Sequence, residues 1–254
     1  MMHNLIISIV TPSYNQGKFL EQTICSVIKQ PYPNIEHIIM DGGSKDNTVE
    51  IIKKYEKYIN YWESKPDKGQ ANAINKGFKM ATGKYIGWLN SDDYLEPNIL
   101  KDVVRVFEED YNIGTVFGKI HIVNEKGEKI GERFNRKKIT VNRLLNGGVQ
   151  INQPGSFHRK SLLDKYGFLD ESLNYAMDYE LWIRLGQYSK FKQIDKFVAN
   201  HRFHQASKTQ SEFIKFIPEI KRIRKKYEGK FFCKKMVDIF KIELGYLRRE
   251  IVGF

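Results

Sequence analysis

Two adjacent carboxylates in the first half of the sequence have the clearest capacity for chemistry. They lie in Asn90-Ser91-Asp92-Asp93, directly after the apolar segment 85–89. Two neighbouring carboxylates repel each other unless a cation or a hydrogen-bond donor compensates their charge. A divalent cation does this through oxygen ligands and can hold a diphosphate at the same time. The alternative is a structural pair at the start of a helix, where Asp is common.

The elements that must position this pair alternate between strand and helix. Short apolar segments that read as strands occur at 5–10, 35–40, 61–64 and 84–90. Apolar residues recur at helical spacing within 19–28, 49–59 and 69–81, and a further helix runs to about residue 109 with Pro97 in its first turn. This alternation predicts a mostly parallel sheet with helices on both faces.

Three polar turns follow strands of this predicted sheet, at 11–16, 41–46 and 91–93. Folds of this kind bind ligands beyond the carboxyl ends of their strands. We therefore expect the three turns to lie together and to form a binding site.

The second half of the chain has a different pattern. Two strand-like segments at 115–123 and 129–134 flank a polar turn and predict a hairpin. Predicted elements that follow are a strand at 155–158 and helices at 160–166 and 178–188. From about residue 211 the chain is basic and helical, with an apolar stripe made by Met236, Phe240, Leu244, Leu247 and Ile251.

Composition excludes several classes of protein. The 254 residues are 41% hydrophobic and 28% charged, which is ordinary for a globular domain and excludes a disordered, collagen-like or disulfide-stapled chain. The two cysteines, Cys25 and Cys233, are too few for a disulfide framework and predict reduced thiols in a cytoplasmic protein. We expect neither a signal peptide nor a membrane span of about 20 apolar residues.

The net charge of +12 is concentrated near the C-terminus. Residues 205–254 contain 13 Lys and Arg against 6 Asp and Glu, a net charge of +7. A plain solvated helix explains this pattern, and so does an amphipathic helix that contacts anionic lipid at the inner face of a membrane. We expect no nucleic-acid partner, because no nucleic-acid-binding motif accompanies the charge.

Five segments resemble a known family when they are taken together and in order. They are SIVTPSYN at 8–15, IIMDGGSKDNT at 38–48, DKGQANAINKG at 67–77, WLNSDD at 88–93 and MDYELW at 177–182. The chain resembles the family 2 glycosyltransferases over roughly residues 5–205. The resemblance implies the α/β, Rossmann-like GT-A fold, a mostly parallel mixed sheet flanked by helices, with a C-terminal helical extension.

The resemblance also implies a division of the chain. Residues 1–210 would form the catalytic domain, with 1–110 binding the nucleotide-sugar and 111–210 binding the acceptor. Residues 211–254 would form the basic helical extension. Residues implied to contact the donor are Thr11, Pro12, Tyr14, Asp41, Lys68, Gln70, Asn90 and Asp92.

Within this set, Thr11, Pro12 and Tyr14 would line the base and ribose pocket, and Asp41 would accept a hydrogen bond from the nucleobase. Lys68 and Gln70 begin a helix, where backbone N–H groups and a cation suit a phosphate. Asp92 would contact the ribose.

Asp93 would ligate Mn²⁺ or Mg²⁺, and His204 is a further candidate ligand. Ser207 and Lys208 are candidates for contact with the diphosphate.

The resemblance assigns the general base to Asp178, where Met177 replaces the acid that usually precedes it. Glu180 is the alternative base. A structural alternative for Asp178 is the N-cap of the helix that follows.

These residues imply an inverting, metal-dependent transfer of a sugar from a nucleotide-diphospho-sugar, with UDP favoured, to a hydroxyl of a glycan, lipid-linked or protein acceptor. The expected setting is synthesis of cell-surface polysaccharide or glycoconjugate. The absence of a Q-x-x-R-W element favours addition of a single sugar. The alternatives are a nucleotidyltransferase of similar fold and a non-catalytic nucleotide- or anion-binding protein. A dehydrogenase is excluded, because no G-x-G-x-x-G follows the first strand.

Overall fold

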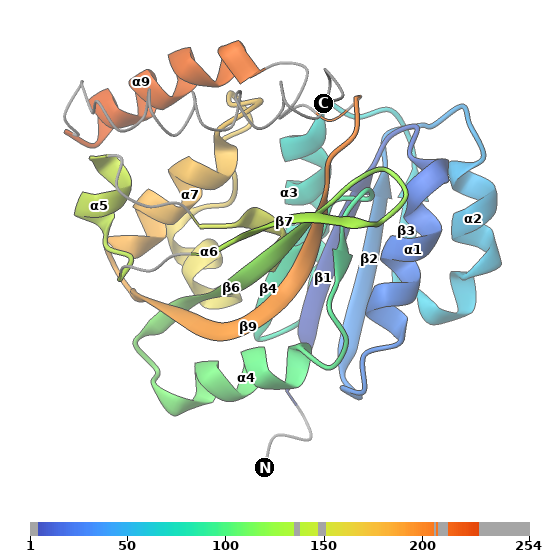
Figure 1. Cartoon of the computed structure of the whole chain (residues 1–254), viewed down its shortest axis with the longest axis horizontal. Coiled ribbons are helices and arrows are strands. Elements are labelled where there is room, and N and C mark those ends of the chain that lie inside the picture. The colour runs from blue at the N-terminus through green and yellow to red at the C-terminus, as the bar shows by residue number, and fades with distance from the viewer. Residues whose placement is uncertain (1–4, 135–137, 147–150, 206, 208–212, 229–254) are drawn as a thin grey trace.

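One sheet runs through the computed structural model, which describes residues 5–134, 138–146, 151–205, 207 and 213–228 (Figure 1). Within these residues the sheet has nine strands in the order β3-β2-β1-β4-β8-β6-β9-β5, and β7 pairs with β6 at one side. Cys25 is a free thiol in this structure, whereas Cys233 and the predicted apolar stripe at 236–251 lie outside the described residues.

The first four long strands of the sheet are parallel, as predicted. They are β1 (Ile7–Ser13), β2 (Ile35–Asp41), β3 (Tyr61–Ser64) and β4 (Tyr85–Trp88). All seven residues of β1 are buried, because β2 and β4 flank it and helices cover both faces. A strand in this position reads as a continuous apolar run rather than as an alternating one.

The second half of the sheet is mixed. Strands β6 (Ile113–Val123) and β7 (Lys129–Arg133) form the predicted hairpin. Strand β8 (Ser156–Arg159) pairs antiparallel with both β4 and β6 and so joins the two halves. Strand β9 (Lys190–Arg202) runs parallel to β6, and β5 (Tyr94–Leu95) pairs antiparallel with β9.

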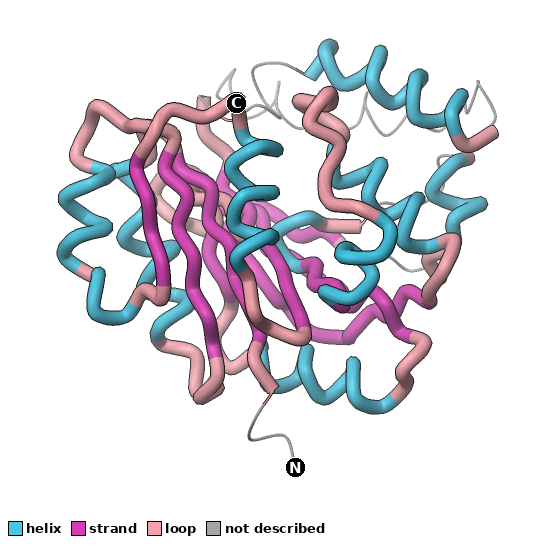
Figure 2. Tube along the Cα trace, turned by 180° about the vertical axis from the view of Figure 1, so that it is seen from behind, coloured by secondary structure: helices cyan, strands magenta, loops and turns pink. Residues whose placement is uncertain are grey.

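Helices cover both faces of the sheet (Figures 1 and 2). Helices α1 (Gly17–Ile28), α2 (Thr48–Lys54) and α4 (Leu100–Glu109) pack on one face, through two apolar clusters. The other face carries α3 (Gln70–Met80) and α7 (Met177–Gly186), which share a third cluster.

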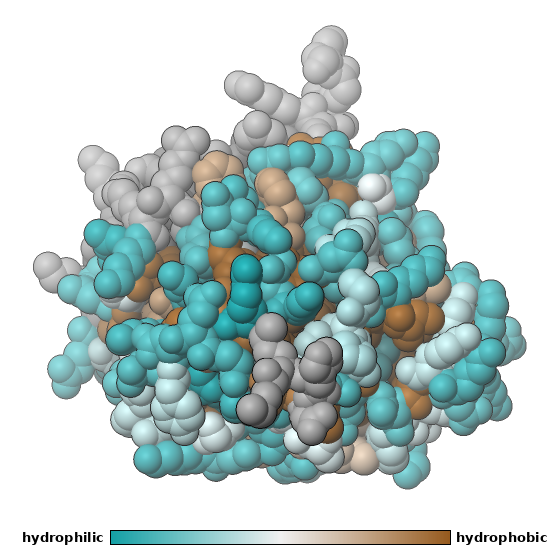
Figure 3. Space-filling view, turned by 90° about the horizontal axis from the view of Figure 1, so that it is seen from below, coloured by the Kyte–Doolittle hydropathy of each residue, from teal (hydrophilic) through white to brown (hydrophobic). Residues whose placement is uncertain are grey.

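The remaining elements of the described chain are η1 (Glu56–Tyr58), α5 (Val141–Leu145), η2 (Gln153–Gly155), α6 (Lys160–Tyr166), η3 (Phe213–Lys215) and α9 (Phe216–Lys226). None of the helices in these ranges is long and apolar enough to cross a bilayer. Figure 3 shows the face at the amino ends of the central strands, which is mostly hydrophilic.

Two helix starts differ from the prediction. Helix α4 begins at Leu100 rather than at Pro97, because Asn98 has a left-handed φ of 61° that a helix cannot contain. The Oε1 atom of Gln30 accepts the Ile99 and Leu100 N–H groups and so caps this helix from a distance. Helix α7 begins at Met177, so Asp178 is its second residue and not its N-cap.

Candidate active site

The three predicted polar turns meet at the carboxyl edge of strands β1, β2 and β4. The Asn15 N–H donates to Ser44 Oγ at 2.7 Å, and the Gly17 N–H donates to Asp46 Oδ2 at 2.9 Å. These bonds tie the turn after β1 to the turn after β2. A Cβ atom added to Gly42 would lie 2.9 Å from Asp67 Oδ2. The segment before α3 therefore closes over the same place, and Asp67 is a neighbour that the sequence interpretation missed.

The two adjacent aspartates have different partners. Asp93 is fully buried, and its Oδ1 accepts the Arg202 N–H at 2.9 Å and lies 3.2 Å from His201 Nδ1. Asp92 keeps 19% of its side chain exposed, and its Oδ2 lies 3.0 Å from His204 Nε2. The structure therefore brings Asp92 and His204 together, whereas Asp93 faces the interior.

Burial dominates the electrostatics of Asp93. Loss of water raises the pKa of the Asp93 carboxyl; His201 opposes this rise and the charge of Asp92 adds to it. The backbone N–H of Arg202 also favours the ionised form. Asp93 is thus a buried acceptor that joins the β4 turn to the end of β9.

The Arg202 side chain holds the turn after β4 through hydrogen bonds. The sequence interpretation did not single out this residue. Its buried guanidinium donates to the backbone oxygens of Asp92 at 2.9 Å and Glu125 at 2.8 Å, and to Gln22 Oε1 at 2.5 Å. The Phe19 ring lies under this guanidinium at 4.8 Å and also contacts the His204 ring, with 4.8 Å between centroids. The position of Arg202 between His201 and His204 was the sequence signal that could have identified it.

A chain of amide side chains connects three elements at the same edge. Gln70 Nε2 donates to Asn90 Oδ1 at 2.9 Å, and Asn90 Nδ2 donates to Gln153 Oε1 at 3.1 Å. Gln153 Nε2 in turn donates to the Trp88 backbone oxygen at 2.8 Å. The start of α3, the end of β4 and η2 are therefore fixed relative to one another. Gln70 and Asn90, which the sequence assigned to one site, lie in contact.

Two residues predicted to contact the base, Tyr14 and Asp41, differ in exposure: the Tyr14 side chain is exposed, whereas the Asp41 carboxylate is buried and hydrogen-bonded. Tyr14 is 61% exposed at the edge of the sheet, so its ring is free to stack. Asp41 is buried, and its carboxylate accepts from the N–H groups of Gly43 and Ser44 and from the hydroxyls of Ser44 and Ser64. These donors use the acceptor capacity of a carboxylate. Asp41 therefore organises the turn, and its contact with a base stays a prediction.

Thr11 and Pro12 are buried within β1. The Thr11 hydroxyl lies 3.0 Å from His37 Nε2 and faces the interior. Contact of either residue with a ligand stays a prediction. Lys68 is exposed at the turn before α3, where a cation can reach an anion near the helix N-terminus.

Asp178 is a carboxylate without a basic partner among the residues that the structure describes. It lies in the first turn of α7, partly exposed, and its Oδ1 accepts the Tyr179 N–H at 2.7 Å. Burial raises the pKa of the Asp178 carboxyl to about 6; backbone N–H groups oppose the rise and the charge of Glu219 adds to it. This pKa lies close to neutrality, where a general base works well.

Glu180, two residues further on, is committed to other groups. It is 1% exposed, and its carboxylate binds Arg184 at 2.8 Å, Lys226 at 3.0 Å and the Tyr227 hydroxyl at 2.6 Å. Burial by itself would raise the pKa of the Glu180 carboxyl, but these partners hold it below the usual value. A carboxylate held by two cations is a poor base, so the structure favours Asp178 over Glu180.

Of the two candidates after His204, only Ser207 lies in the described chain, where its N–H donates to the His204 backbone oxygen at 2.9 Å. Lys208 lies outside the described residues.

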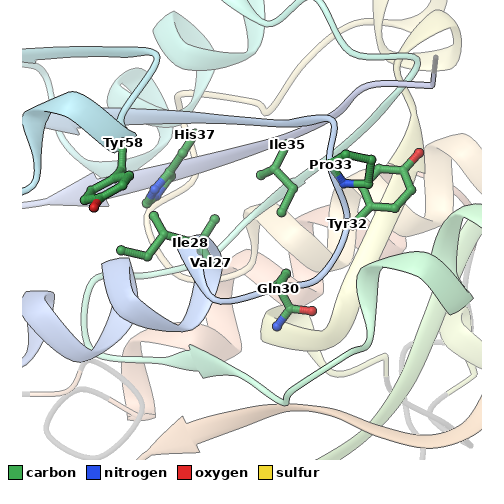
Figure 4. A pocket seen from close by; sticks show the side chains of 8 residues that line it. All are labelled: Val27, Ile28, Gln30, Tyr32, Pro33, Ile35, His37 and Tyr58. Atoms are coloured by element: carbon green, nitrogen blue, oxygen red, sulfur yellow. The ribbon is translucent and has the colours of Figure 1, made fainter. Parts of the chain in front are cut away.

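A cavity of about 170 Å³ lies far from this edge, where β2 begins (Figure 4). It is lined by Val27, Ile28, Gln30, Tyr32, Pro33, Ile35, His37 and Tyr58. The Gln30 side chain is occupied by the cap of α4, and burial lowers the pKa of His37 to about 3. This cavity contains no charged group and no pair of groups suited to catalysis.

Sequence comparison identifies the family that the geometry suggests. Residues 8–167 match the family model described as "Glycosyl transferase family 2". The chain is 31% identical over 204 residues to a chondroitin synthase of Pasteurella multocida (strain Pm70), a match that covers 78% of this chain and 21% of that protein. An uncharacterized glycosyltransferase of Rickettsia prowazekii (strain Madrid E) is 28% identical over 216 residues, or 83% of this chain and 68% of that protein. The chain thus spans about a fifth of the length of the synthase.

Solved structures confirm the fold. TarS of S. aureus in complex with UDP-GlcNAc has a TM-score of 0.69 and 20% identity, covering 86% of this chain and 66% of that chain. The mannosyltransferase PcManGT from Pyrobaculum calidifontis, in complex with GDP-Man and Mn²⁺, has a TM-score of 0.62 and 15% identity, covering 80% and 58%. The expected mixed α/β sheet flanked by helices is confirmed by this likeness.

Proposed function

Because the chain belongs to glycosyl transferase family 2, we propose that it transfers a sugar from a nucleotide-diphospho-sugar to a hydroxyl group of an acceptor, with inversion at the anomeric carbon. The observation that carries this proposal is the pairing of Asp92 with His204 where the polar turns converge. UDP is the favoured nucleotide. A glycan, a lipid-linked sugar or a protein is the acceptor class.

For the metal we prefer Asp92 to Asp93. Asp92 and His204 offer an oxygen and a nitrogen donor 3.0 Å apart, and the nitrogen makes Mn²⁺ a better fit than the oxygen-preferring Mg²⁺. Asp93 is fully buried, its Oδ1 is engaged by the Arg202 N–H and His201, and its Oδ2 accepts from Asn90 Nδ2 at 3.4 Å. Within the described ranges no group of three or more His, Cys, Asp or Glu side chains stands ready to hold an ion, so the donor diphosphate would complete the ligand set. When bound, the ion would neutralise charge on the departing diphosphate.

The chain's own residues have separate tasks in the transfer. Tyr14 offers a flat face to the base, and Lys68 lies beside the N-terminus of α3, where a phosphate is favoured. Asp178 accepts the proton of the acceptor hydroxyl. The acceptor oxygen then bonds to the anomeric carbon as the bond from that carbon to the diphosphate breaks, and the nucleoside diphosphate leaves.

Titration calorimetry tests the donor half of this proposal. UDP, UDP-GlcNAc and GDP-mannose are titrated into the full chain with Mn²⁺ and with a chelator. We expect one nucleotide to bind at least tenfold more tightly with Mn²⁺, and the Asp92→Asn variant to lose that gain. Asp195→Asn is the control, because its side chain is 91% exposed on β9. Equal affinity with Mn²⁺ and with the chelator, for all three nucleotides, would contradict the metal-assisted donor site.

We also propose that the outward side of α9 contacts an anionic membrane. Ile223 and Arg224 are buried against the protein, whereas Lys221, Arg222 and Lys225 are exposed. Exposed cations on one side of a helix attract acidic lipids at low salt. Co-sedimentation with vesicles of phosphatidylserine and phosphatidylcholine at low and high salt tests this contact. Equal recovery with neutral and anionic vesicles would exclude it.

A further inference from the structure

The geometry assigns to Glu219 on α9 the role of a positioning residue: it fixes the first turn of α7 and thereby the carboxylate of Asp178. This inference rests on the proposed function, since it takes Asp178 as the base. It gives the C-terminal helix a task in the reaction besides any contact with a membrane.

Glu219 binds the backbone directly before α7. Its carboxylate accepts the N–H groups of Asn174 at 2.8 Å, Tyr175 at 2.9 Å and Ala176 at 2.8 Å. Hydrogen bonds to an ionised acceptor are about twice as strong as neutral ones. One side chain therefore holds three consecutive residues that lead into Met177 and Asp178.

Helix α7 supplies one first-turn acceptor of its own, Asp178 Oδ1 for the Tyr179 N–H, but its N-cap position supplies none. Its N-cap is Ala176, which has no side-chain acceptor. Helix N-termini carry unsatisfied N–H groups and a partial positive charge, and both favour a nearby anion. In most helices a local Ser, Thr, Asp or Asn provides that acceptor. Here a Glu more than forty residues away in the chain provides it for the segment that enters the helix.

The segment formed by α9 and its C-cap, Tyr227, also contacts the residues of α7 that follow Asp178 in the sequence. Lys226 and Tyr227 bind the buried Glu180 carboxylate, and Arg224 Nε lies 3.3 Å from the Tyr179 hydroxyl. Figure 1 shows α9 lying across the end of the molecule at which α7 begins. Asp178 thus lies between two sets of contacts with one helix. Misplacement of a base by about 1 Å can lower the rate about 100-fold. Loss of the contacts between α9 and α7 should therefore lower kcat more than it lowers donor affinity.

Three measurements on Glu219→Ala and Glu219→Gln test this role. The first is amide hydrogen exchange of the peptide spanning 172–182. The second is kcat with the nucleotide-sugar that the calorimetry identifies, using donor hydrolysis when no acceptor is known. The third is donor affinity. Glu50→Ala is the matched control, because Glu50 also lies in the first turn of a helix and is exposed.

We expect Glu219→Ala to exchange faster at 172–182 and to lose 10- to 100-fold in kcat, with donor affinity within about twofold of the parent. Glu219→Gln keeps an acceptor oxygen, so its exchange rate and kcat should lie between those of the parent and of Glu219→Ala. Unchanged exchange would overturn the inference, and so would faster exchange with unchanged kcat. Full turnover in Asp178→Asn would instead overturn the base assignment, and the exchange result would still show whether Glu219 orders this turn. Gln also serves as the readout if the Ala variant does not fold.

Discussion

The turn after β4 and the start of α7 each present carboxylates, but the surroundings of these carboxylates differ. At the turn, His201, His204 and the Arg202 N–H surround Asp92 and Asp93. At α7, Asp178 has no cationic partner in the described chain, and its pKa rises to about 6. Carboxylates compensated by donors are suited to hold charge, whereas an uncompensated one is suited to take a proton.

A second contrast exists within α7 itself. Asp178 and Glu180 are two residues apart on a helix, so they point in different directions. Glu180 points into Arg184, Lys226 and Tyr227, and Asp178 does not. Both acids lie in the same turn of the same helix, so the local sequence does not distinguish them. The side chains that contact each acid determine its chemistry.

The largest expected effect comes from removing the proton acceptor. Asp178→Asn should lower kcat by about 100- to 10,000-fold, the usual contribution of a general base, with little change in UDP affinity. Turnover assays and calorimetry on the same preparation measure both. Asp164→Asn is the control, because Asp164 is a half-exposed helical aspartate paired with Lys160. Parent-like kcat in Asp178→Asn would remove the distinction between the two carboxylate sites.

The rate should also depend on pH through the same group. A base works when deprotonated, so kcat should be constant above the pKa of Asp178, about 6, and should fall about tenfold per pH unit below it. A profile of kcat from pH 4.5 to 8.5 with saturating donor measures this. A kcat that stays nearly constant down to pH 5, as the ordinary Asp value of 3.8 would give, would mean that burial does not perturb the group.

The turn should respond to mutation chiefly in stability. Asp93→Ala leaves the Arg202 N–H and His201 without their acceptor in a buried place, which costs about 2–3 kcal/mol. For a chain of this size we expect a fall in Tm of about 5–10 °C. Asp92→Ala, at a partly exposed position, should shift Tm by less than half as much. Equal shifts in differential scanning calorimetry would show that the two aspartates are equivalent.

The smallest expected effect has the opposite sign. The folded-state pKa of Asp178 lies above the ordinary Asp value of 3.8, so its contribution to stability is present at low pH and is lost as pH rises through about 6. At pH 8 the charge costs about 1–3 kcal/mol, and Asp178→Asn should raise Tm by about 3–8 °C. The gain should shrink at pH 5. Thermal unfolding at the two pH values measures it, and a lower Tm at pH 8 would contradict a desolvated carboxylate.

The sequence allowed much of the first half to be predicted, because its signals are local. Strand β3 has the bounds that were expected, and β1, β2 and β4 differ from the prediction by a few residues. The predicted start of α4 was wrong because Asn98 has a left-handed φ of 61°, and the acceptor that caps the helix, Gln30, lies 69 positions before Ile99 in the sequence. The structural alternative for Asp178, an N-cap, was wrong because Ala176 holds that position. The N–H groups of Asn174, Tyr175 and Ala176 are bound by Glu219 of α9.

By itself the sequence determined the alternation of strands and helices in the first half of the chain, and with it the edge of the sheet where the polar turns meet. Apolar periodicity and turn residues act over a few positions, so they can be read along the chain. Only the tertiary structure decided which aspartate pairs with His204, which one is buried, and which acid of α7 has no cationic partner among the described residues. Those outcomes depend on contacts between residues about a hundred positions apart, and on a C-terminal helix that packs beside α7. Burial and charge act through space, and folding alone sets those distances.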